Sequence, residues 1–175
     1  MNSTHGLQGL FLRQLIPQDL GALMDLQEQV LRELPDPMWY MPSTREEHEE
    51  DIASGDMFGC WDGQVLVGFA ALSPWRFRVE KAYAAKVGDP IENTYDVRDL
   101  MVHTGYRRRG ISSAFLRVFE EMARKAGGRA IYATIDPGNL PSIRGFEKAG
   151  YVHVRTQPAY DGRLRGYYRL ALLCC

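Results

Sequence analysis

A run of cations stands directly before an apolar stretch in the sequence GYRRRGISSAFL, which covers residues 105–116. The start of a helix leaves about four backbone amides without an intrahelical acceptor, and the helix dipole makes that end electropositive. Gly110 removes a side chain where a ligand could approach the backbone. Such a turn suits a phosphate, but a solvated basic loop is an equally good interpretation of these residues alone.

A second group of chemically competent side chains lies just before that turn. The segment TYDVRDLMV, residues 94–102, holds Asp96, Arg98 and Asp99. In a regular strand Asp96 and Arg98 point to one face and Asp99 to the other, and a bulge would change that alternation. A carboxylate here could take a proton from an alkylammonium group, while structural ion pairs are the alternative.

Composition narrows the classes of protein that can carry these groups. The chain has 175 residues, 45% of them apolar, and a formal net charge of −1. We therefore expect one globular domain over residues 1–175, without a nucleic-acid or membrane partner. Neither a membrane-spanning run nor a secretory signal is evident, so a cytoplasmic location is expected. Three cysteines are too few for a disulfide framework. Cys60 is expected to be buried, and the role of Cys174 and Cys175 is open.

The apolar periodicity predicts an α/β domain with a partly parallel and partly antiparallel sheet. Helices are expected over 17–34, from Ser43 or Thr44 to Gly55, over 111–126 and over 141–149. Strands are expected over 10–16, on both sides of Asp62-Gly63, and over 94–103, 130–135, 151–155 and 165–172. Residues 73–93 are ambiguous, and we interpret them as an extended strand followed by a loop at 88–90.

Two segments carry a resemblance to a known family. LMVHTGYRRRGIS, residues 100–112, resembles the signature of the GNAT superfamily, the acyl-CoA-dependent N-acyltransferases. Arg107, Gly110 and Ser112 occupy its key positions, although serine departs from the usual glycine or alanine. NLPSIRGFEKAGY, residues 139–151, resembles the second signature of the family. The resemblance covers nearly the whole chain and implies a three-layer domain, with a mixed sheet of about seven strands flanked by four helices.

The resemblance implies a site for acetyl-CoA as cosubstrate. By that likeness the pyrophosphate contacts the turn and the pantetheine arm runs beside the end of the strand. The implied cofactor-binding residues are Met101, Val102, Arg107, Arg108, Arg109, Gly110, Ile111, Ser112, Ser113 and Asn139. Asn139 could equally be the N-cap of the helix that follows it.

The resemblance also implies catalytic positions. The amide of Leu100 falls where the family polarises the acyl carbonyl, and Asp96 and Arg98 fall where it can carry the base. His103 is a weaker candidate for the base. Phe146 stands where the family often has a tyrosine that protonates the leaving thiolate. It could lie beside the sulfur without a proton to give, or it could be a core residue.

The function expected from these residues is transfer of an acetyl group from acetyl-CoA to a primary amine of a small molecule or peptide, by direct attack and without a metal. A non-catalytic CoA-binding module is the first alternative, because of Phe146. A nucleic-acid-binding domain that uses the arginine run is the second, and the near-neutral charge argues against it. The acceptor, the preferred acyl chain and the oligomeric state, a homodimer included, are left open.

Overall fold

The structure of the chain is a computed structural model that describes residues 7, 9–77, 79–159 and 162–172. Cys174 and Cys175 therefore lie outside the described residues. The strands are β1 Leu10–Gln14, β2 Met57–Asp62, β3 Val65–Pro74, β4 Thr94–Val102, β5 Ala130–Ile135, β6 Val152–Ala159 and β7 Arg163–Ala171. The α-helices are α1 Leu20–Arg32, α2 Arg45–Ala53, α3 Tyr83–Val87, α4 Ile111–Lys125 and α5 Leu140–Lys148.

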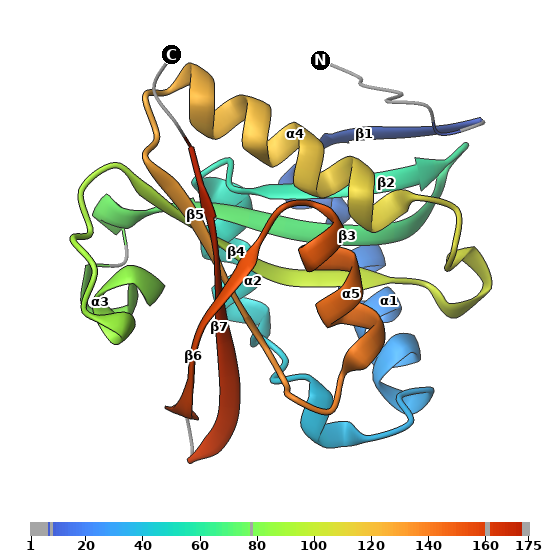
Figure 1. Cartoon of the computed structure of the whole chain (residues 1–175). Helices are drawn as coiled ribbons and strands as arrows, with labels where there is room; N and C mark the ends of the chain where they lie inside the picture. Colours follow the sequence, from blue (N-terminus) through green and yellow to red (C-terminus); the bar gives the residue numbers. More distant parts are fainter. Residues whose placement is uncertain (1–6, 8, 78, 160–161, 173–175) are drawn as a thin grey trace. The chain divides into compact units, whose positions relative to one another are not determined.

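Hydrogen bonds join the strands into one seven-stranded sheet in the order β1-β2-β3-β4-β5-β7-β6 (Figure 1). The pair β4–β5 is parallel, and the pairs β1–β2, β2–β3, β5–β7 and β6–β7 are antiparallel. The prediction of a mixed α/β sheet of about seven strands is thus confirmed. Five α-helices, rather than the four expected, accompany the sheet in the described part of the chain.

The chain divides into two compact units. Unit 1 comprises Met1–Ala71 and Asp99–Phe115, and unit 2 comprises Leu72–Arg98 and Leu116–Cys175. The strands β3 and β4 and the helix α4 each contribute residues to both units. Unit 1 holds the arginine turn with the end of β4, whereas unit 2 holds Asp96, Arg98 and Asn139.

Local sequence signals set the boundaries of the elements in unit 1. The Thr44 hydroxyl accepts a hydrogen bond from the Glu47 amide at 3.2 Å, and the Glu47 carboxylate accepts one from the Thr44 amide at 2.9 Å. This capping box begins α2 as predicted. Gly63, with φ of 56°, turns the chain between β2 and β3 and confirms the predicted hairpin.

An ion pair ties β1 to the start of α1. The Arg13 guanidinium donates to both carboxylate oxygens of Asp19, at 2.6 and 3.0 Å, and the Ile16 amide donates to the same carboxylate at 2.9 Å. The hydrogen bond from Arg13 is the main reason that the pKa of Asp19 lies below its ordinary value. The guanidinium of Arg13 also lies 4.2 Å from the centroid of the Trp61 ring. The ion pair between Arg13 and Asp19 therefore holds the residue directly before α1 against β1.

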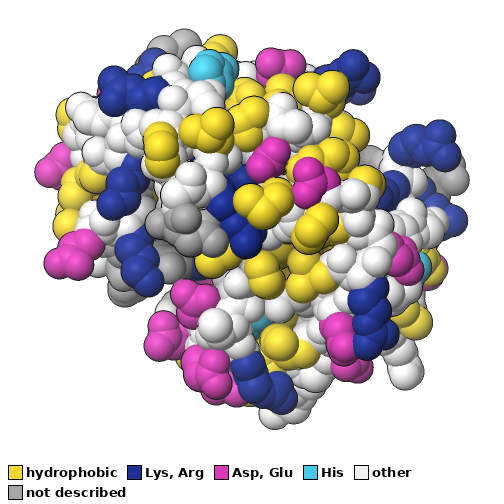
Figure 2. All heavy atoms as spheres, turned by 90° about the horizontal axis from the view of Figure 1, so that it is seen from below, with side chains coloured by type: hydrophobic (Ala, Val, Ile, Leu, Met, Phe, Trp, Pro, Cys, Tyr) yellow, Lys and Arg dark blue, Asp and Glu magenta, His cyan; other side chains and the backbone are white. Residues whose placement is uncertain are grey.

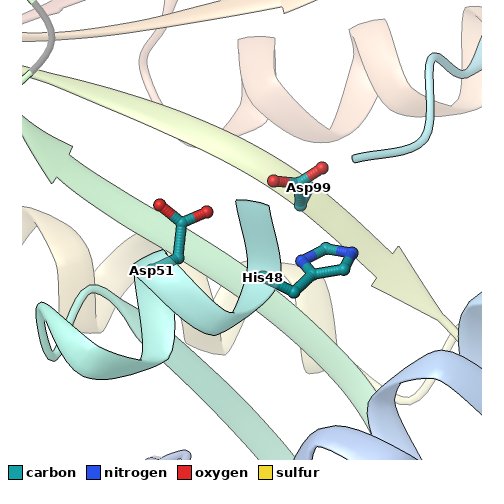
Figure 3. A group of neighbouring side chains, drawn as sticks. All are labelled: His48, Asp51 and Asp99. Atoms are coloured by element: carbon teal, nitrogen blue, oxygen red, sulfur yellow. The ribbon is translucent and has the colours of Figure 1, made fainter. Parts of the chain in front are cut away.

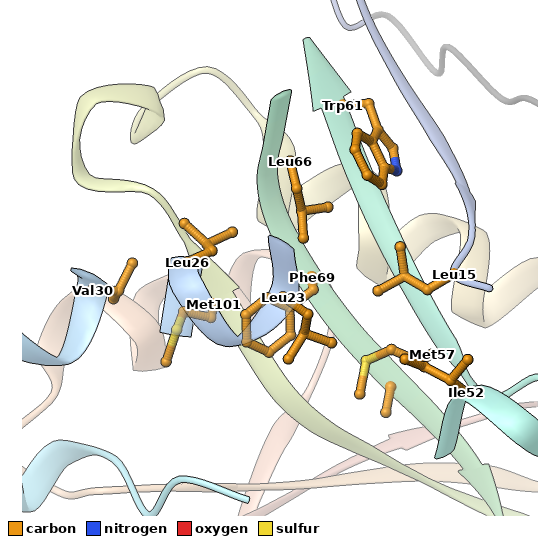
Figure 4. Packing of buried hydrophobic residues seen from close by; sticks show 11 residues of the cluster. Leu15, Leu23, Leu26, Val30, Ile52, Met57, Trp61, Leu66, Phe69 and Met101 are labelled. Atoms are coloured by element: carbon orange, nitrogen blue, oxygen red, sulfur yellow. The ribbon is translucent and has the colours of Figure 1, made fainter. Parts of the chain in front are cut away.

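The core of unit 1 packs α1 and α2 against β2, β3 and the end of β4 (Figure 4). The α1 side chains Leu23, Leu26 and Val30 are buried there, together with Phe69 of β3 and Met101 of β4. Burying each such side chain contributes about 1.5–3 kcal/mol to folding. The apolar face predicted for α1 therefore holds this helix beside the strand segment that contains Leu100 and Val102.

The prediction for residues 73–93 is wrong in part. After β3 the chain forms two 3-10 turns, Trp75–Phe77 and Val79–Lys81, and then α3 instead of an extended strand. Gly88 ends α3 in a left-handed conformation with φ of 82°. The helix forms because Ala84 and Val87 bury against a small core of unit 2 that includes Tyr132 and Tyr167.

Two further expectations can be compared with the described residues. Cys60 is free and buried as predicted, and burial raises its pKa to about 11. No helix in the described ranges combines the length and the apolar character needed to cross a membrane.

Candidate active site

The arginine turn, residues 104–110, leads from β4 into α4 in unit 1. It opens with a 3-10 turn over Thr104–Tyr106 and leaves its three arginines exposed. Arg108 and Gly110 both have left-handed backbone conformations, with φ of 62° and 81°. The left-handed conformation at residue 110 therefore favours glycine. This reason adds to the one inferred from the sequence, which was close approach of a ligand to the backbone.

The amides at the start of α4 are available to an anion by helix geometry. The first hydrogen bond of the helix runs from the Ala114 amide to the Gly110 carbonyl at 2.9 Å. The amides of residues 111–113 precede that bond and have no helical acceptor. Among the described residues, a Cβ atom added at Gly110 would have one neighbour within 4 Å, the Leu7 Cδ2 atom at 4.0 Å. There is thus room for a Cβ atom at Gly110 itself, directly before these amides in the chain.

Contacts within unit 1 hold the turn in place. The Tyr106 hydroxyl donates to Asp62 Oδ2 at 2.8 Å, and this hydrogen bond raises the pKa of Tyr106 above its ordinary value. The guanidinium of Arg109 lies 4.6 Å over the Tyr106 ring. His103 is half-buried in the turn, where its Nδ1 accepts from the Gly105 amide at 3.0 Å. The turn is therefore anchored to the β2–β3 hairpin.

The strand segment before the turn packs closely on its β3 side. The His103 amide donates to the Val67 carbonyl at 2.9 Å. A Cβ atom at Gly68 would lie 3.1 Å from the Met101 carbonyl oxygen and 3.2 Å from Ile111 Cγ2. The ladder between β4 and β5 covers Thr94 to Val97 of β4. The residues from Asp99 to Val102 lie beyond that ladder.

Asp99 interrupts the regular conformation of β4. Its φ is 53°, a left-handed value that aspartate tolerates better than most residues. Its Oδ1 atom accepts hydrogen bonds from the Tyr40 hydroxyl at 3.1 Å and from the Ser43 hydroxyl at 2.9 Å. Its side chain is half-buried. The alternation predicted for a regular strand therefore does not extend past Arg98, as a bulge would require.

Two buried residues of α2 face Asp99 (Figure 3). His48 is fully buried and Asp51 is 9% exposed. One nitrogen or oxygen atom from each of these three residues lies within 4.8 Å of the other two. His48 Nε2 is 2.9 Å from the Gln27 Oε1 atom, and Gln27 Nε2 donates to the Ser43 carbonyl at 3.1 Å. The amide of Gln27 thus presents an acceptor to His48, which places a proton on Nε2.

The other two predicted catalytic side chains lie in unit 2. The Asp96 carboxylate is 4% exposed and accepts from the Tyr83 amide at 3.1 Å. Arg98 is 9% exposed and donates to the Ser73 hydroxyl from Nε at 3.1 Å and from Nη2 at 2.8 Å. Both side chains have structural partners, and their predicted catalytic roles stay predictions.

The second signature forms α5 in unit 2. The Asn139 side chain accepts from the Ser142 amide at 3.2 Å, which makes it the N-cap of α5, one of its two expected roles. Phe146 is 4% exposed and packs edge-to-face on Tyr151, with ring centroids 5.0 Å apart. Burial holds the pKa of Tyr151 well above its ordinary value. Phe146 therefore has the surroundings of a core residue.

The sequence profile of the acetyltransferase (GNAT) family matches residues 23–151. This match spans the arginine turn, β4 and the second signature. The chain belongs to the GNAT acetyltransferase family, and the resemblance found in the sequence is confirmed.

Solved structures show the same fold. An N-acetyltransferase from Staphylococcus aureus Mu50 superimposes with a TM-score of 0.71 and 22% identity, over 94% of this chain and 99% of that one. The protein yncA from Salmonella typhimurium, solved with its cofactor acetyl-CoA, gives a TM-score of 0.70 and 16% identity, over 94% of each chain.

One curated relative also matches. Mycothiol acetyltransferase from Corynebacterium glutamicum is 22% identical over 106 residues, which make up 61% of this chain and 31% of that protein. The match thus spans about a third of the length of that relative.

His48 and Asp51 were not among the residues predicted from the sequence. They lie in a helix, REEHEEDIA, whose composition reads as polar on every side. Their spacing of three residues, with Ile52 next to Asp51, places them on one face of the helix. This spacing could have indicated that His48 and Asp51 share a face with Ile52. The structure shows that this face of the helix is buried.

Proposed function

We propose that the chain is an acetyl-CoA-dependent N-acetyltransferase that acts on a primary amine. The observation that carries the proposal is the arginine turn at the start of α4. It combines exposed guanidinium groups, a left-handed glycine and amides without helical acceptors. Membership of the GNAT family and the acetyl-CoA described for yncA support the choice of cosubstrate.

The residues of the turn fit a diphosphate. Amides of residues 111–113 can donate to phosphate oxygens, and Arg107 and Arg108 can add charge-assisted hydrogen bonds. The strand segment Met101–Val102 lies beyond the β5 ladder, so its backbone can pair with the amides of a pantetheine arm. The side chain of Asn139 caps α5. Its expected contact with the pantetheine arm stays a prediction.

The proposed reaction exchanges a carbon–sulfur bond for a carbon–nitrogen bond. Acetyl-CoA supplies an activated thioester, and the amide of Leu100 donates to the acyl oxygen, where negative charge develops. An alkylammonium must first lose one proton to a base. Its second proton accompanies the thiolate as free CoA, and the products are the amide, CoA and one proton released to solvent.

Two carboxylates of β4 are candidates for the base. The family resemblance implies Asp96, and the near-complete burial of this residue counts against direct contact with an acceptor. Asp99 is half-buried and directly precedes Leu100, in the same unit as the arginine turn. We expect Asp99→Asn to lower kcat/KM for the amine more than Asp96→Asn, with the loss shrinking at high pH. The pH profiles of both variants test this, and a larger effect of Asp96→Asn would identify Asp96 as the base.

A thiol-release assay with acetyl-CoA and a panel of primary amines tests the proposed activity. The expected result is release of CoA that depends on both the amine and the protein. Stabilisation by CoA in a thermal unfolding assay without thiol release from any amine favours a non-catalytic CoA-binding module.

A nucleic-acid-binding role has weaker support. On the face drawn in Figure 2, acidic and basic side chains are interspersed with hydrophobic ones, and no broad basic field covers that face. The net charge of −1 agrees with this distribution. Binding of DNA or RNA that weakens steeply with salt would revive the alternative.

A further inference from the structure

In unit 1, the candidate base Asp99 lies beside His48 and Asp51 of α2, two residues to which the proposed reaction gives no role. One nitrogen of the imidazole and one oxygen of each carboxylate lie within 4.8 Å of one another, and His48 and Asp51 are buried. Burying charge is costly unless the charges compensate one another. A positive charge on His48 would therefore offset part of the cost of burying the two carboxylates.

The two carboxylates beside His48 oppose the effect of its burial, which alone would favour a neutral imidazole. Its Nε2 proton is fixed by Gln27 of α1. Its other ring nitrogen lies on the side that faces the two carboxylates (Figure 3). The ring also has an edge-to-face contact with Phe69 of β3, at 5.8 Å between centroids. Among the described residues, the charged side chains grouped with the His48 ring are Asp51 of α2 and Asp99 of β4. The negative charge of each carboxylate favours the imidazolium form of His48.

An imidazolium with two carboxylates leaves one net negative charge. Asp99 is the most exposed residue of the group, although its Oδ2 atom is itself buried. Its Oδ1 atom is held by the hydroxyls of Tyr40 and Ser43. In this charge state the remaining negative charge is assigned to Asp99, which directly precedes Leu100, where it would match the single positive charge of a primary ammonium group.

We propose that His48 is a positioning residue for acetyl transfer, which as an imidazolium beside Asp51 holds Asp99 ionised to bind the acceptor ammonium and receive its proton. This inference rests on the proposed function. The acceptor loses one N–H proton to the Asp99 carboxylate, and that proton leaves to solvent after the amide is released. His48 keeps both of its ring protons throughout, so it acts only through Asp99.

The first experiment measures the protonation of His48 without relying on activity. Nitrogen NMR of protein labelled with ¹⁵N-histidine is recorded near pH 8 with and without EDTA, and the His48 signals are assigned with His48→Gln. An unperturbed histidine, which titrates near pH 6.5, is neutral there. The expected result is two protonated ring nitrogens for His48. Asp51→Asn is expected to lower the pH at which the second proton is lost, because one of the two anions is gone.

The second experiment compares kinetics of the parent, His48→Gln and the control His153→Gln, an exposed histidine bonded to Thr156 in β6. His48→Gln is expected to lower kcat/KM for the amine roughly 10- to 100-fold, as for loss of a nearby opposite charge. The KM for acetyl-CoA stays unchanged. The acid limb of the pH profile moves to higher pH, a shift that a purely structural role would not produce.

Each outcome bears on one proposal. A His48 with a single proton near pH 8 overturns the inference, as does a divalent metal in the purified protein whose removal by EDTA alters the His48 signals. A pH profile of His48→Gln that superimposes on that of the parent also overturns it. If the parent acetylates no amine, the proposed function fails, while the NMR result still decides the charge of His48.

Discussion

Replacing Gly110 by alanine separates the backbone role of this glycine from its role in the proposed phosphate site. With φ of 81°, Gly110 has a left-handed conformation that costs a residue with a Cβ atom about 1–2 kcal/mol. The nearest atom to an added Cβ is Leu7 Cδ2, at 4.0 Å, so no steric clash adds to that cost. We expect the free energy of unfolding to fall by about 1–2 kcal/mol while the fold stays intact.

The added methyl group is on the residue that directly precedes the amides of residues 111–113 in the chain. Loss of one hydrogen bond from an amide to an anionic phosphate costs about 1.5–3 kcal/mol. Since 1.4 kcal/mol is a factor of ten, the Kd for acetyl-CoA is expected to rise roughly tenfold to a hundredfold. Isothermal titration calorimetry measures the affinity, and urea unfolding measures the stability.

Gly88→Ala is the matched control. Gly88 ends α3 in unit 2 with φ of 82°, and an added Cβ there meets nothing within 4 Å. It should cost the same stability and leave the affinity for acetyl-CoA unchanged. If both variants bind acetyl-CoA like the parent, or if both lose affinity equally, the placement of the diphosphate at this turn is refuted.

Two further predictions concern packing and charge. Phe146→Tyr should lower stability by about 1–3 kcal/mol without raising turnover, because its hydroxyl is buried beside Tyr151; faster turnover at an unchanged melting temperature contradicts this. Asp19→Asn should cost about 2 kcal/mol at neutral pH, since the Asp19 carboxylate is bonded to Arg13. Because folding lowers the pKa of Asp19, its carboxylate stabilises the fold fully above the unfolded pKa of about 3.9, and this stabilisation is lost as pH falls through the folded pKa. Urea unfolding should therefore show that the difference in stability between the parent and Asp19→Asn vanishes in acid.

Local signals in the sequence were enough to predict most elements. Thr44 and Glu47 begin α2 through hydrogen bonds between residues three apart, which a sequence shows directly. Gly63 turns the predicted hairpin through its own backbone freedom. The arginine turn could also be predicted from a local signal, because Gly110 directly precedes the first residue of the helix in the sequence.

Features that depend on distant contacts could not be predicted in the same way. The short helix α3 is stabilised by burial of Ala84 and Val87 beside strand residues far along the chain. The left-handed conformation of Asp99 is accompanied by hydroxyls from the loop before α2. The burial of His48 requires Gln27 of α1 and Phe69 of β3, neither of which lies near it in the sequence.

The central claim, transfer of an acetyl group to an amine, is tested most directly by following both products of one reaction. The protein is incubated with acetyl-CoA and a primary amine that is active in the thiol-release panel, or with the whole panel if none is. Mass spectrometry then quantifies the N-acetylated amine while thiol release is recorded. One amide formed for each CoA released, with both absent when the amine is omitted, is the predicted result. Saturable binding of acetyl-CoA with no amide from any amine would contradict the claim.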